Sequence, residues 1–276
     1  MNRVNVLVFI LLFTALGNIR ASGPAPAELP ASQPRPKIIG YLAGREPHFQ
    51  DMLPPYPKVD SMQDMADVTT LWQWQHPENT RWQLADADEE MSYGRFSQAF
   101  GAEIDRATAP LLVHLLDRAE RDVQGVAFDA KSFYNRPRPY QRFQLAHVCG
   151  TDKPPAPELP LKGGSSYPSG HTSYGWAAVL ILSEVAPEHA QQLLIRGQEY
   201  GESRVVCAMH YPSDVVGGQL VATAVVARLH TNLEFEEDLG CAKEEHTAVL
   251  KGNSQLSPEC QLREAQWNQG PSSGLC

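Results

Sequence analysis

The chain has 276 residues, of which 42% are hydrophobic, so it can bury a full core in one large domain or two small ones. Its formal net charge of −9 argues against a general binder of nucleic acid or of anionic membrane, because an acidic surface repels such partners. Any cationic site in this protein must therefore be local.

The N-terminal residues have the composition of a targeting segment. Arg3 supplies a positive charge, residues 4–16 are apolar, and Ala21 offers a small residue for cleavage. Because the apolar run is short for a membrane span, we interpret residues 1–21 as a signal peptide and expect a periplasmic or secreted protein. Residues 22–37 form a Pro/Ala-rich leader, and no later apolar run is long enough for stable membrane insertion.

Beyond the proline-rich N-terminal loops the sequence is persistently helical. The helical spacing of apolar residues is strongest after Thr108, with Pro110 in the first turn, and this helix either continues to Lys131 or breaks near Gly125. Because alternating β-branched strands with hairpin turns do not occur, we predict an all-α fold, with one compact multi-helix domain over residues 38–248. The other expected helices span residues 61–75, 79–91, 93–100, 172–185, 187–206 and 213–230.

The C-terminal end of the chain has a different composition. From Cys241 onward it is polar and rich in Gly, Ser and Gln. Such a composition specifies no element, so we expect residues 249–276 to form a peripheral, Cys-containing polar tail.

Five cysteines in an exported chain predict disulfides, because the compartment is oxidising, and the odd number leaves one thiol over. No Cys or His spacing is typical of zinc, and no metal is expected. We predict a Cys149–Cys207 bridge, since each residue lies near a segment that must converge on one site. Cys241 is expected to pair with Cys260 or Cys276.

A small-residue loop, residues 165–172, runs directly into an apolar helix. Such a loop presents free backbone N–H groups at the positive end of the helix dipole, which suits an anion. Gly170 lets the backbone approach a ligand, Ser169 can donate its hydroxyl, and His171 can transfer a proton near neutral pH. The alternative is a Ser-capped helix that has a histidine in its first turn.

Two basic residues, Lys131 and Arg138, form a second candidate group. Their separation is about two helical turns, so on a helix both side chains would share a face. Pro137 and Pro139 must distort the end of that helix. The alternative is a basic helix end that complements the dipole and faces solvent.

A third stretch contains Arg204, His210 and Asp214. Pro212 fits the first position of a new helix, which puts His210 just outside it, and Asp214 lies where a carboxylate could hold a ring nitrogen of the histidine. The alternative is that Asp214 is only a first-turn acid favoured by the dipole. Three cations, an anion-binding loop and two histidines are the inventory for phosphoryl transfer without a metal.

In this order the three stretches resemble the three-part signature of the type 2 phosphatidic acid phosphatase superfamily. Within it the chain is most similar to the secreted bacterial class A nonspecific acid phosphatases, over residues 38–248. Each part alone is weak, whereas the ordered triple is highly specific. The matching motifs are Lys131-x6-Arg138-Pro139, Pro168-Ser169-Gly170-His171 and Ser203-Arg204-x5-His210-x3-Asp214.

The resemblance implies an all-helical fold of the acid phosphatase/vanadium haloperoxidase type, often a homodimer, that hydrolyses phosphate monoesters in the periplasm without a cofactor. By matching position, His210 would be the nucleophile that forms a phosphohistidine, and Asp214 would orient it. His171 would protonate the leaving oxygen and then activate water. The groups that would hold the phosphoryl oxygens are Lys131, Arg138, Ser169, Gly170 and Arg204.

Some residues depart from the family pattern or fall between its motifs. Many family members have Trp after the second histidine where this chain has Tyr211, so we expect a changed wall of the substrate pocket. We interpret Arg136 as a surface group or as a support for the motif residues. Tyr167 and Trp176 fit pocket walls and core packing equally. The remaining histidines are expected to be surface or core residues: His48, His76, His114, His147, His189, His230 and His246.

Other functions share this signature or would use such a site. A membrane-embedded lipid phosphatase is disfavoured because no transmembrane helix follows the signal peptide. A vanadate-dependent haloperoxidase is disfavoured by the short chain, and a non-catalytic periplasmic phosphate-binding protein is the non-enzyme alternative. For a phosphatase we expect an acidic pH optimum, since one histidine must be unprotonated to attack while the other is protonated to donate.

Overall fold

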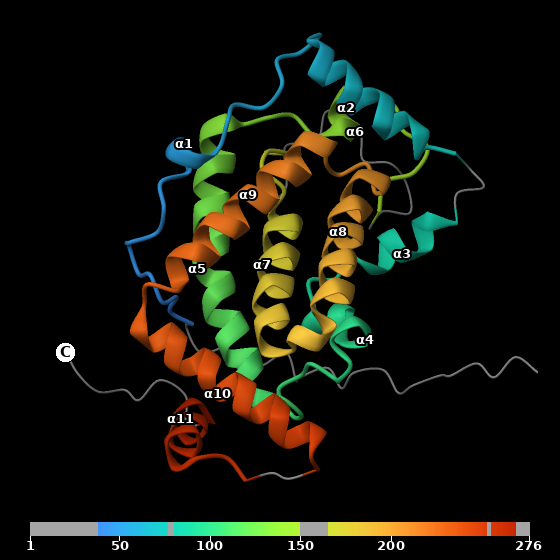
Figure 1. The fold of residues 1–276 in the computed structure, drawn as a ribbon. Coiled ribbons are helices and arrows are strands. Elements are labelled where there is room, and N and C mark those ends of the chain that lie inside the picture. Colours follow the sequence, from blue (N-terminus) through green and yellow to red (C-terminus); the bar gives the residue numbers. More distant parts are fainter. Residues whose placement is uncertain (1–37, 77–79, 150–164, 253–254, 269–276) are drawn as a thin grey trace, which may run out of the picture. The chain divides into compact units, whose positions relative to one another are not determined.

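The fold comes from a computed structural model that describes residues 38–76, 80–149, 165–252 and 255–268, all within one unit of the chain. The predicted signal peptide, the leader and Cys276 lie outside the described residues. Every regular element in the described part is a helix (Figure 1), which confirms the all-α prediction. None of these helices combines the length and the apolar composition needed to cross a membrane.

The predicted helices agree with the observed ones to within a few residues, except at the chain end. The range predicted over residues 187–206 is divided into η2 and α8, and the helix predicted after Thr108 passes through Gly125 without a break. The elements in chain order are α1 (Phe49–Met52), α2 (Met62–Gln73), α3 (Arg81–Ala87), the 3₁₀ turn η1 (Tyr93–Phe96), α4 (Ser97–Phe100), α5 (Pro110–Tyr134), α6 (Pro139–Arg142), α7 (Gly170–Val185), the 3₁₀ turn η2 (Pro187–His189), α8 (Ala190–Val206), α9 (Pro212–Leu229), α10 (Leu233–Leu250) and α11 (Pro258–Asn268).

The central helix is α7. Apart from His171 in its first turn and Glu184 in its last, it carries no ionisable side chain other than a tyrosine, and most of its residues are buried. A helix that is apolar all round must be surrounded by others. Accordingly, α7 packs against α5, α8, α9 and α10 (Figure 1).

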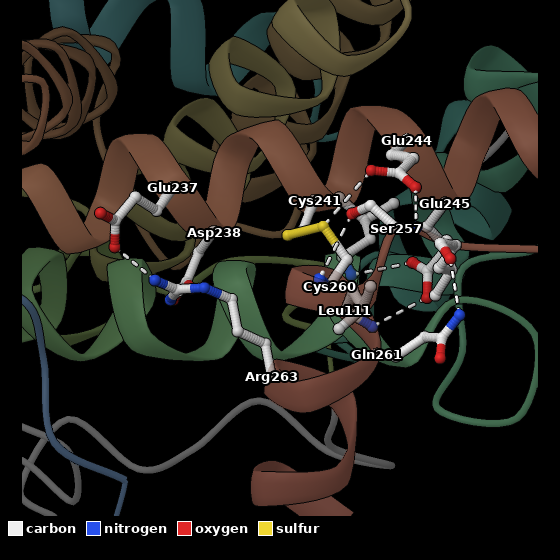
Figure 2. Close-up of a disulfide and its surroundings, with 12 residues drawn as sticks. Leu111, Glu237, Asp238, Cys241, Glu244, Glu245, Ser257, Cys260, Gln261 and Arg263 are labelled. Atoms are coloured by element: carbon white, nitrogen blue, oxygen red, sulfur yellow. Dashed lines mark hydrogen bonds and ion pairs between the residues drawn. A yellow bond between two sulfur atoms is a disulfide. The ribbon is translucent and has the colours of Figure 1, made fainter.

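A residue of α10 caps the N-terminus of α5. Ala109, which precedes α5, has no capping side chain. Instead the amides of Leu111 and Leu112 donate to the two carboxylate oxygens of Glu245, each at 3.0 Å (Figure 2). One buried carboxylate therefore satisfies two of the free N–H groups at this helix end and complements the helix dipole.

The chain end differs from the prediction of a polar, undefined segment. α10 runs through Cys241, and the disulfide Cys241–Cys260 joins it to α11. Arg263 of α11 also pairs with Glu237 and Asp238 of α10 (Figure 2). The sequence did not reveal α10 because its inward side includes Asp238 and other charged groups that are buried by pairing, so its apolar stripe is interrupted.

Close contact between α7 and α9 should make Gly218 intolerant of a side chain. A Cβ there would lie 2.6 Å from the carbonyl oxygen of Ser169 and 2.9 Å from Cβ of Thr172. We expect Gly218→Ala to lower the free energy of unfolding by about 1–3 kcal/mol, because the helices must move apart. Gly240→Ala, in an exposed turn of α10 with open space around it, should raise it by about 0.5–1 kcal/mol. Denaturant unfolding measures both, and equal effects would contradict the close helix crossing.

Candidate functional site

His210 and Asp214 lie together at the start of α9. Both are buried, and Nδ1 of His210 is 3.4 Å from Oδ2 of Asp214. The same carboxylate oxygen accepts a hydrogen bond from the Tyr211 amide at 2.8 Å, which caps the helix. The two interpretations of Asp214 are thus both correct, since it is a first-turn acid and also faces the histidine.

The contacts of His210 determine which ring nitrogen is protonated. Nε2 lies 3.2 Å from a guanidinium nitrogen of Arg138. Because a guanidinium can only donate, Nε2 must accept, and the proton is on Nδ1, toward Asp214. Burial, followed by the charges of Arg138 and Lys131, lowers the pKa of His210 well below its usual value. The ring therefore presents an unprotonated nitrogen to a cationic cluster.

That cluster consists of Lys131 from α5, Arg138 at the start of α6 and Arg204 from the last turn of α8. Their side chains are buried, with exposed fractions of 5%, 7% and 1%. Nζ of Lys131 donates to the carbonyl oxygen of Ser165 at 2.7 Å. Burial, together with the charge of Arg138, lowers the pKa of Lys131 to about 7.

Two of these cations lack the acidic partners that other buried or half-buried arginines have. In the described residues no carboxylate forms an ion pair with Lys131 or Arg204, and Nε of Arg204 has no hydrogen-bond partner. By contrast, Arg118, Arg196 and Arg263 each pair with a buried aspartate. A buried cation without a counterion is costly, so the cluster is suited to an anion.

Lys131 and Arg138 do not share a helix face, contrary to the prediction. α5 ends at Tyr134, where Asn135 adopts a left-handed conformation with φ of 46°, and the next helix begins only after Arg138. The charge of Arg138 nevertheless acts on Lys131. The alternative of a solvent-facing basic helix end is also wrong, because both side chains are buried.

Hydrogen bonds to both α9 and α7 fix the loop before α7. The amide of Ser169 donates to the carbonyl oxygen of Asp214 at 2.9 Å. The hydroxyl oxygen of Ser169 accepts from the amide and the hydroxyl of Thr172, at 3.2 and 2.9 Å. Ser169 is therefore the helix cap, and its own hydroxyl hydrogen can still be donated to an anion. A Cβ on Gly170 would lie 3.5 Å from Cε of Lys131, so the loop backbone borders the cationic cluster.

His171 differs from His210 in what holds it. Nε2 of His171 lies 2.9 Å from the backbone carbonyl oxygen of Glu89, which can only accept, so Nε2 carries the proton and Nδ1 is the free nitrogen. Burial and the nearby charge of Arg204 lower the pKa of His171 to about 3. A carboxylate stabilises a cationic ring better than a carbonyl does. The arrangement thus suits His210 to carry an electrophile and His171 to exchange a proton.

The structure brings the predicted site residues to one place. The charges of Lys131, Arg138 and Arg204 act on both imidazoles, and the imidazole of His171 acts on that of His210. The residues that meet there are Lys131, Arg138, Ser169, Gly170, His171, Arg204, His210 and Asp214.

The structure decides between the positions that were expected for three residues near the site. Arg136 is not at the surface but buried against Asp214. Tyr211 is fully buried with Arg136 4.0 Å from its ring centre, so it is no pocket wall. Tyr167 packs in the core, where its hydroxyl donates to the carbonyl oxygen of Pro54 at 2.7 Å.

The sequence could not have indicated that Glu89 belongs to the site, because Glu89 contributes its backbone carbonyl, which contacts His171.

One group of potential metal ligands occurs beside the site. Atoms of Asp86, His147 and Cys149 lie within 4.8 Å of one another. Cys149, however, forms a disulfide with Cys207, as predicted, and offers no thiolate. His147 instead lies 3.3 Å from Asp86 and stacks on a tryptophan ring. This group is a packed support for the disulfide rather than a metal centre.

The known proteins to which this chain is similar include several acid phosphatases. Residues 111–236 match the PAP2 superfamily. A non-specific acid phosphatase of Providencia stuartii is 38% identical over 206 residues, which is 72% of this chain and 81% of that protein. An acid phosphatase of Zymomonas mobilis is 32% identical over 249 residues, 88% of this chain and 91% of that protein. A non-specific acid phosphatase of Salmonella typhimurium is 38% identical over 173 residues, 60% of this chain and 66% of that protein.

An anion in the cationic cluster should raise the pKa of His171 from about 3, because it offsets the charge of Arg204 and its neighbours. We expect an increase of at least about two pH units with saturating orthophosphate. NMR titration of the ring resonances with and without phosphate measures it. His230, which lies between Glu184 and Glu236, is the control and should not respond. An unchanged titration of His171 would contradict an anion site at this position.

Proposed function

The chain belongs to the PAP2 superfamily and, within it, to the class A non-specific acid phosphatases, and we propose that it hydrolyses phosphate monoesters through a phosphohistidine. The observation that carries the proposal is the buried His210, which has its unprotonated Nε2 beside Arg138 and its Nδ1 beside Asp214. A nucleophile oriented by a carboxylate and facing a cationic cradle is the arrangement that phosphoryl transfer needs.

The substrate phosphoryl group would bind among Lys131, Arg138 and Arg204. These cations spread positive charge over the three equatorial oxygens, whose negative charge must be stabilised in the transition state. The Ser169 hydroxyl and the Gly170 N–H, at the positive end of α7, would add hydrogen bonds to the same oxygens. Binding the anion also restores the proton affinity that the cations remove from the two histidines.

In the first chemical step Nε2 of His210 would attack phosphorus in line with the ester oxygen. As the P–N bond forms, the O–P bond breaks and its electron pair stays on the leaving oxygen. His171, protonated at Nδ1 once the substrate anion is bound, donates that proton to the leaving oxygen. Asp214 stabilises the positive charge that develops on the His210 ring.

In the second step the deprotonated Nδ1 of His171 would take a proton from water. The water oxygen attacks phosphorus, the P–N bond breaks, and its electron pair returns to Nε2 of His210. Orthophosphate is then the product, and an alcohol in place of water would yield a new phosphate ester. The same histidine acts first as acid and then as base, which the backbone carbonyl of Glu89 permits because it leaves Nδ1 free in both steps.

We further propose that the enzyme acts in the periplasm or as a secreted protein. The composition of residues 1–21, which is typical of a signal peptide, and the two disulfides Cys149–Cys207 and Cys241–Cys260 support an oxidising compartment. Residues 22–37 would then lead into a catalytic domain over residues 38–248. The family resemblance suggests a homodimer whose small-molecule partners are phosphate monoesters.

The proposed function is tested by hydrolysis of p-nitrophenyl phosphate by the mature protein in EDTA at acidic pH. Turnover that survives chelation is expected, since the side chains alone supply the positive charge. Tight phosphate binding without turnover would indicate a binding protein instead. Oxidation of bromide with peroxide and vanadate, in the absence of phosphatase activity, would indicate a haloperoxidase.

His210→Ala should abolish turnover, by at least about 10³-fold, because no other group can form the covalent intermediate. The wild-type enzyme, quenched in base during turnover of a ³²P-labelled ester, should contain base-stable, acid-labile protein-bound label. His210→Ala should contain none, and His230→Ala serves as the matched control that keeps both activity and label. Retention of label in His210→Ala would assign the nucleophile to another residue.

His171→Ala should affect esters according to their leaving groups. Alkyl phosphates need a proton on the departing oxygen, so we expect a loss of about 10²–10⁴ in rate for them. p-Nitrophenyl phosphate, whose leaving group is a stable anion, should lose much less in the phosphorylation step. Rates measured across a series of leaving-group pKa values give the slope. A uniform loss across the series would show that His171 does not act as the acid.

A further inference from the structure

Arg136, in the turn between α5 and α6, contacts the carboxylate that faces the proposed nucleophile. Its exposed fraction is 2%, and one guanidinium nitrogen lies 2.6 Å from Oδ1 of Asp214 and 2.8 Å from the hydroxyl of Ser213. It lies near the phosphate-binding motif, but its side-chain hydrogen bonds and ion pairs in the described residues join it to Ser213 and to aspartates. Its contact with Asp214 therefore has to be explained separately.

Helix α2 holds the other side of this guanidinium. A second nitrogen of Arg136 donates to Oδ2 of Asp67 at 3.0 Å, and Asp64 lies 3.7 Å from it. Asp67 also accepts from the amide of Ser213 at 3.0 Å and from its hydroxyl. Asp67 and Arg136 thus form a clamp that grips the first turn of α9, where Asp214 is located.

The two oxygens of Asp214 have different partners. Oδ1 accepts from Arg136, whereas Oδ2 accepts from the Tyr211 amide and the Ser166 hydroxyl and faces Nδ1 of His210. Because Asp214 is fully buried, its ionised form needs a compensating positive charge. Arg136 supplies that charge directly and at the same time fixes the rotation of the carboxylate.

We propose that Arg136, clamped by Asp67, is a positioning residue for the phosphoryl-transfer reaction: it holds the Asp214 carboxylate in place and offsets part of its negative charge, and thereby sets the basicity of His210. The inference rests on the proposed function, which assigns His210 and Asp214 their roles. Arg136 lies within residues 111–236, whereas Asp67 on α2 precedes them, so one half of the clamp comes from outside the segment that matches the superfamily.

The proposal predicts opposite effects of two charge removals. Loss of the positive charge of Arg136 raises the proton affinity of His210, whereas loss of the negative charge of Asp67 lowers it. Both variants leave unchanged the other charged or titratable groups that face His210 in the described residues. The elements packed around His210 contribute one such group each: Lys131 of α5, Arg138 before α6, His171 of α7, Arg204 of α8 and Asp214 of α9.

The test compares Arg136→Gln and Asp67→Asn with wild type in pH profiles of p-nitrophenyl phosphate hydrolysis. For Arg136→Gln we expect kcat to fall about 10–100-fold with KM changed less than about threefold, because no phosphate contact is lost. The acidic limb of kcat/KM, which requires unprotonated His210, should move to higher pH by about half a unit or more. For Asp67→Asn the limb should move to lower pH. Arg136→Lys, which keeps the positive charge, should have an acidic limb of kcat/KM closer to that of wild type than Arg136→Gln has.

Arg142→Gln is the matched control. Arg142 pairs with Asp64 at 2.8 Å and lies 5.6 Å from the Tyr211 ring, but its described contacts do not include Asp214. It should change kcat less than about threefold and leave the acidic limb in place. Rates are normalised to folded protein by thermal unfolding, so that loss of stability is not counted as loss of catalysis.

The outcomes separate the inference from the proposed function. If wild type hydrolyses the ester but Arg136→Gln and Asp67→Asn only unfold more easily, with unmoved acidic limbs, Arg136 is merely structural and the inference is overturned. Limbs that move in the same direction in both variants would overturn it as well. If wild type has no phosphatase activity, the proposed function fails, and the inference fails with it.

Discussion

Buried positive charge that the described residues do not pair with carboxylates is the constraint on which this site depends. Lys131 and Arg204 are withdrawn from water without an acidic partner among the described residues, and each therefore favours an anion. Burial and these charges lower the pKa values of His171 and His210. In the proposed function, a tetrahedral anion would relieve this repulsion and raise the proton affinity of both rings.

The two imidazoles are made unequal by their partners rather than by their position in the chain. A carboxylate, Asp214, faces His210, and a backbone carbonyl, that of Glu89, holds His171. In the proposed reaction the carboxylate would stabilise a ring that becomes cationic on phosphorylation, whereas the carbonyl only fixes a tautomer. The same residue type can therefore serve as nucleophile in one place and as acid and base in the other.

Two residues of the proposed site are also capping residues at helix N-termini. Ser169 caps α7, and Asp214 caps α9 while it faces His210. The proposed supporting clamp of Arg136 and Asp67 then anchors that α9 turn to α2. The capping of these helices and the geometry of the site are consequently coupled, because each capping residue is also a residue of the proposed site. A substitution that removed either cap would therefore also remove a group from the site.

The sequence by itself determined the helical class, most helix ranges, the Cys149–Cys207 bridge and the identity of the clustered side chains, because periodicity, capping and motif spacing are local properties. Only the tertiary structure decided how the segments meet. The left-handed turn at Asn135 separates Lys131 and Arg138 into different elements, and pairing between distant helices buries Arg136 and the charged side of α10. Such contacts depend on partners far away in the chain. Every residue has a backbone carbonyl, so the sequence could not indicate that the carbonyl of Glu89 would contact His171.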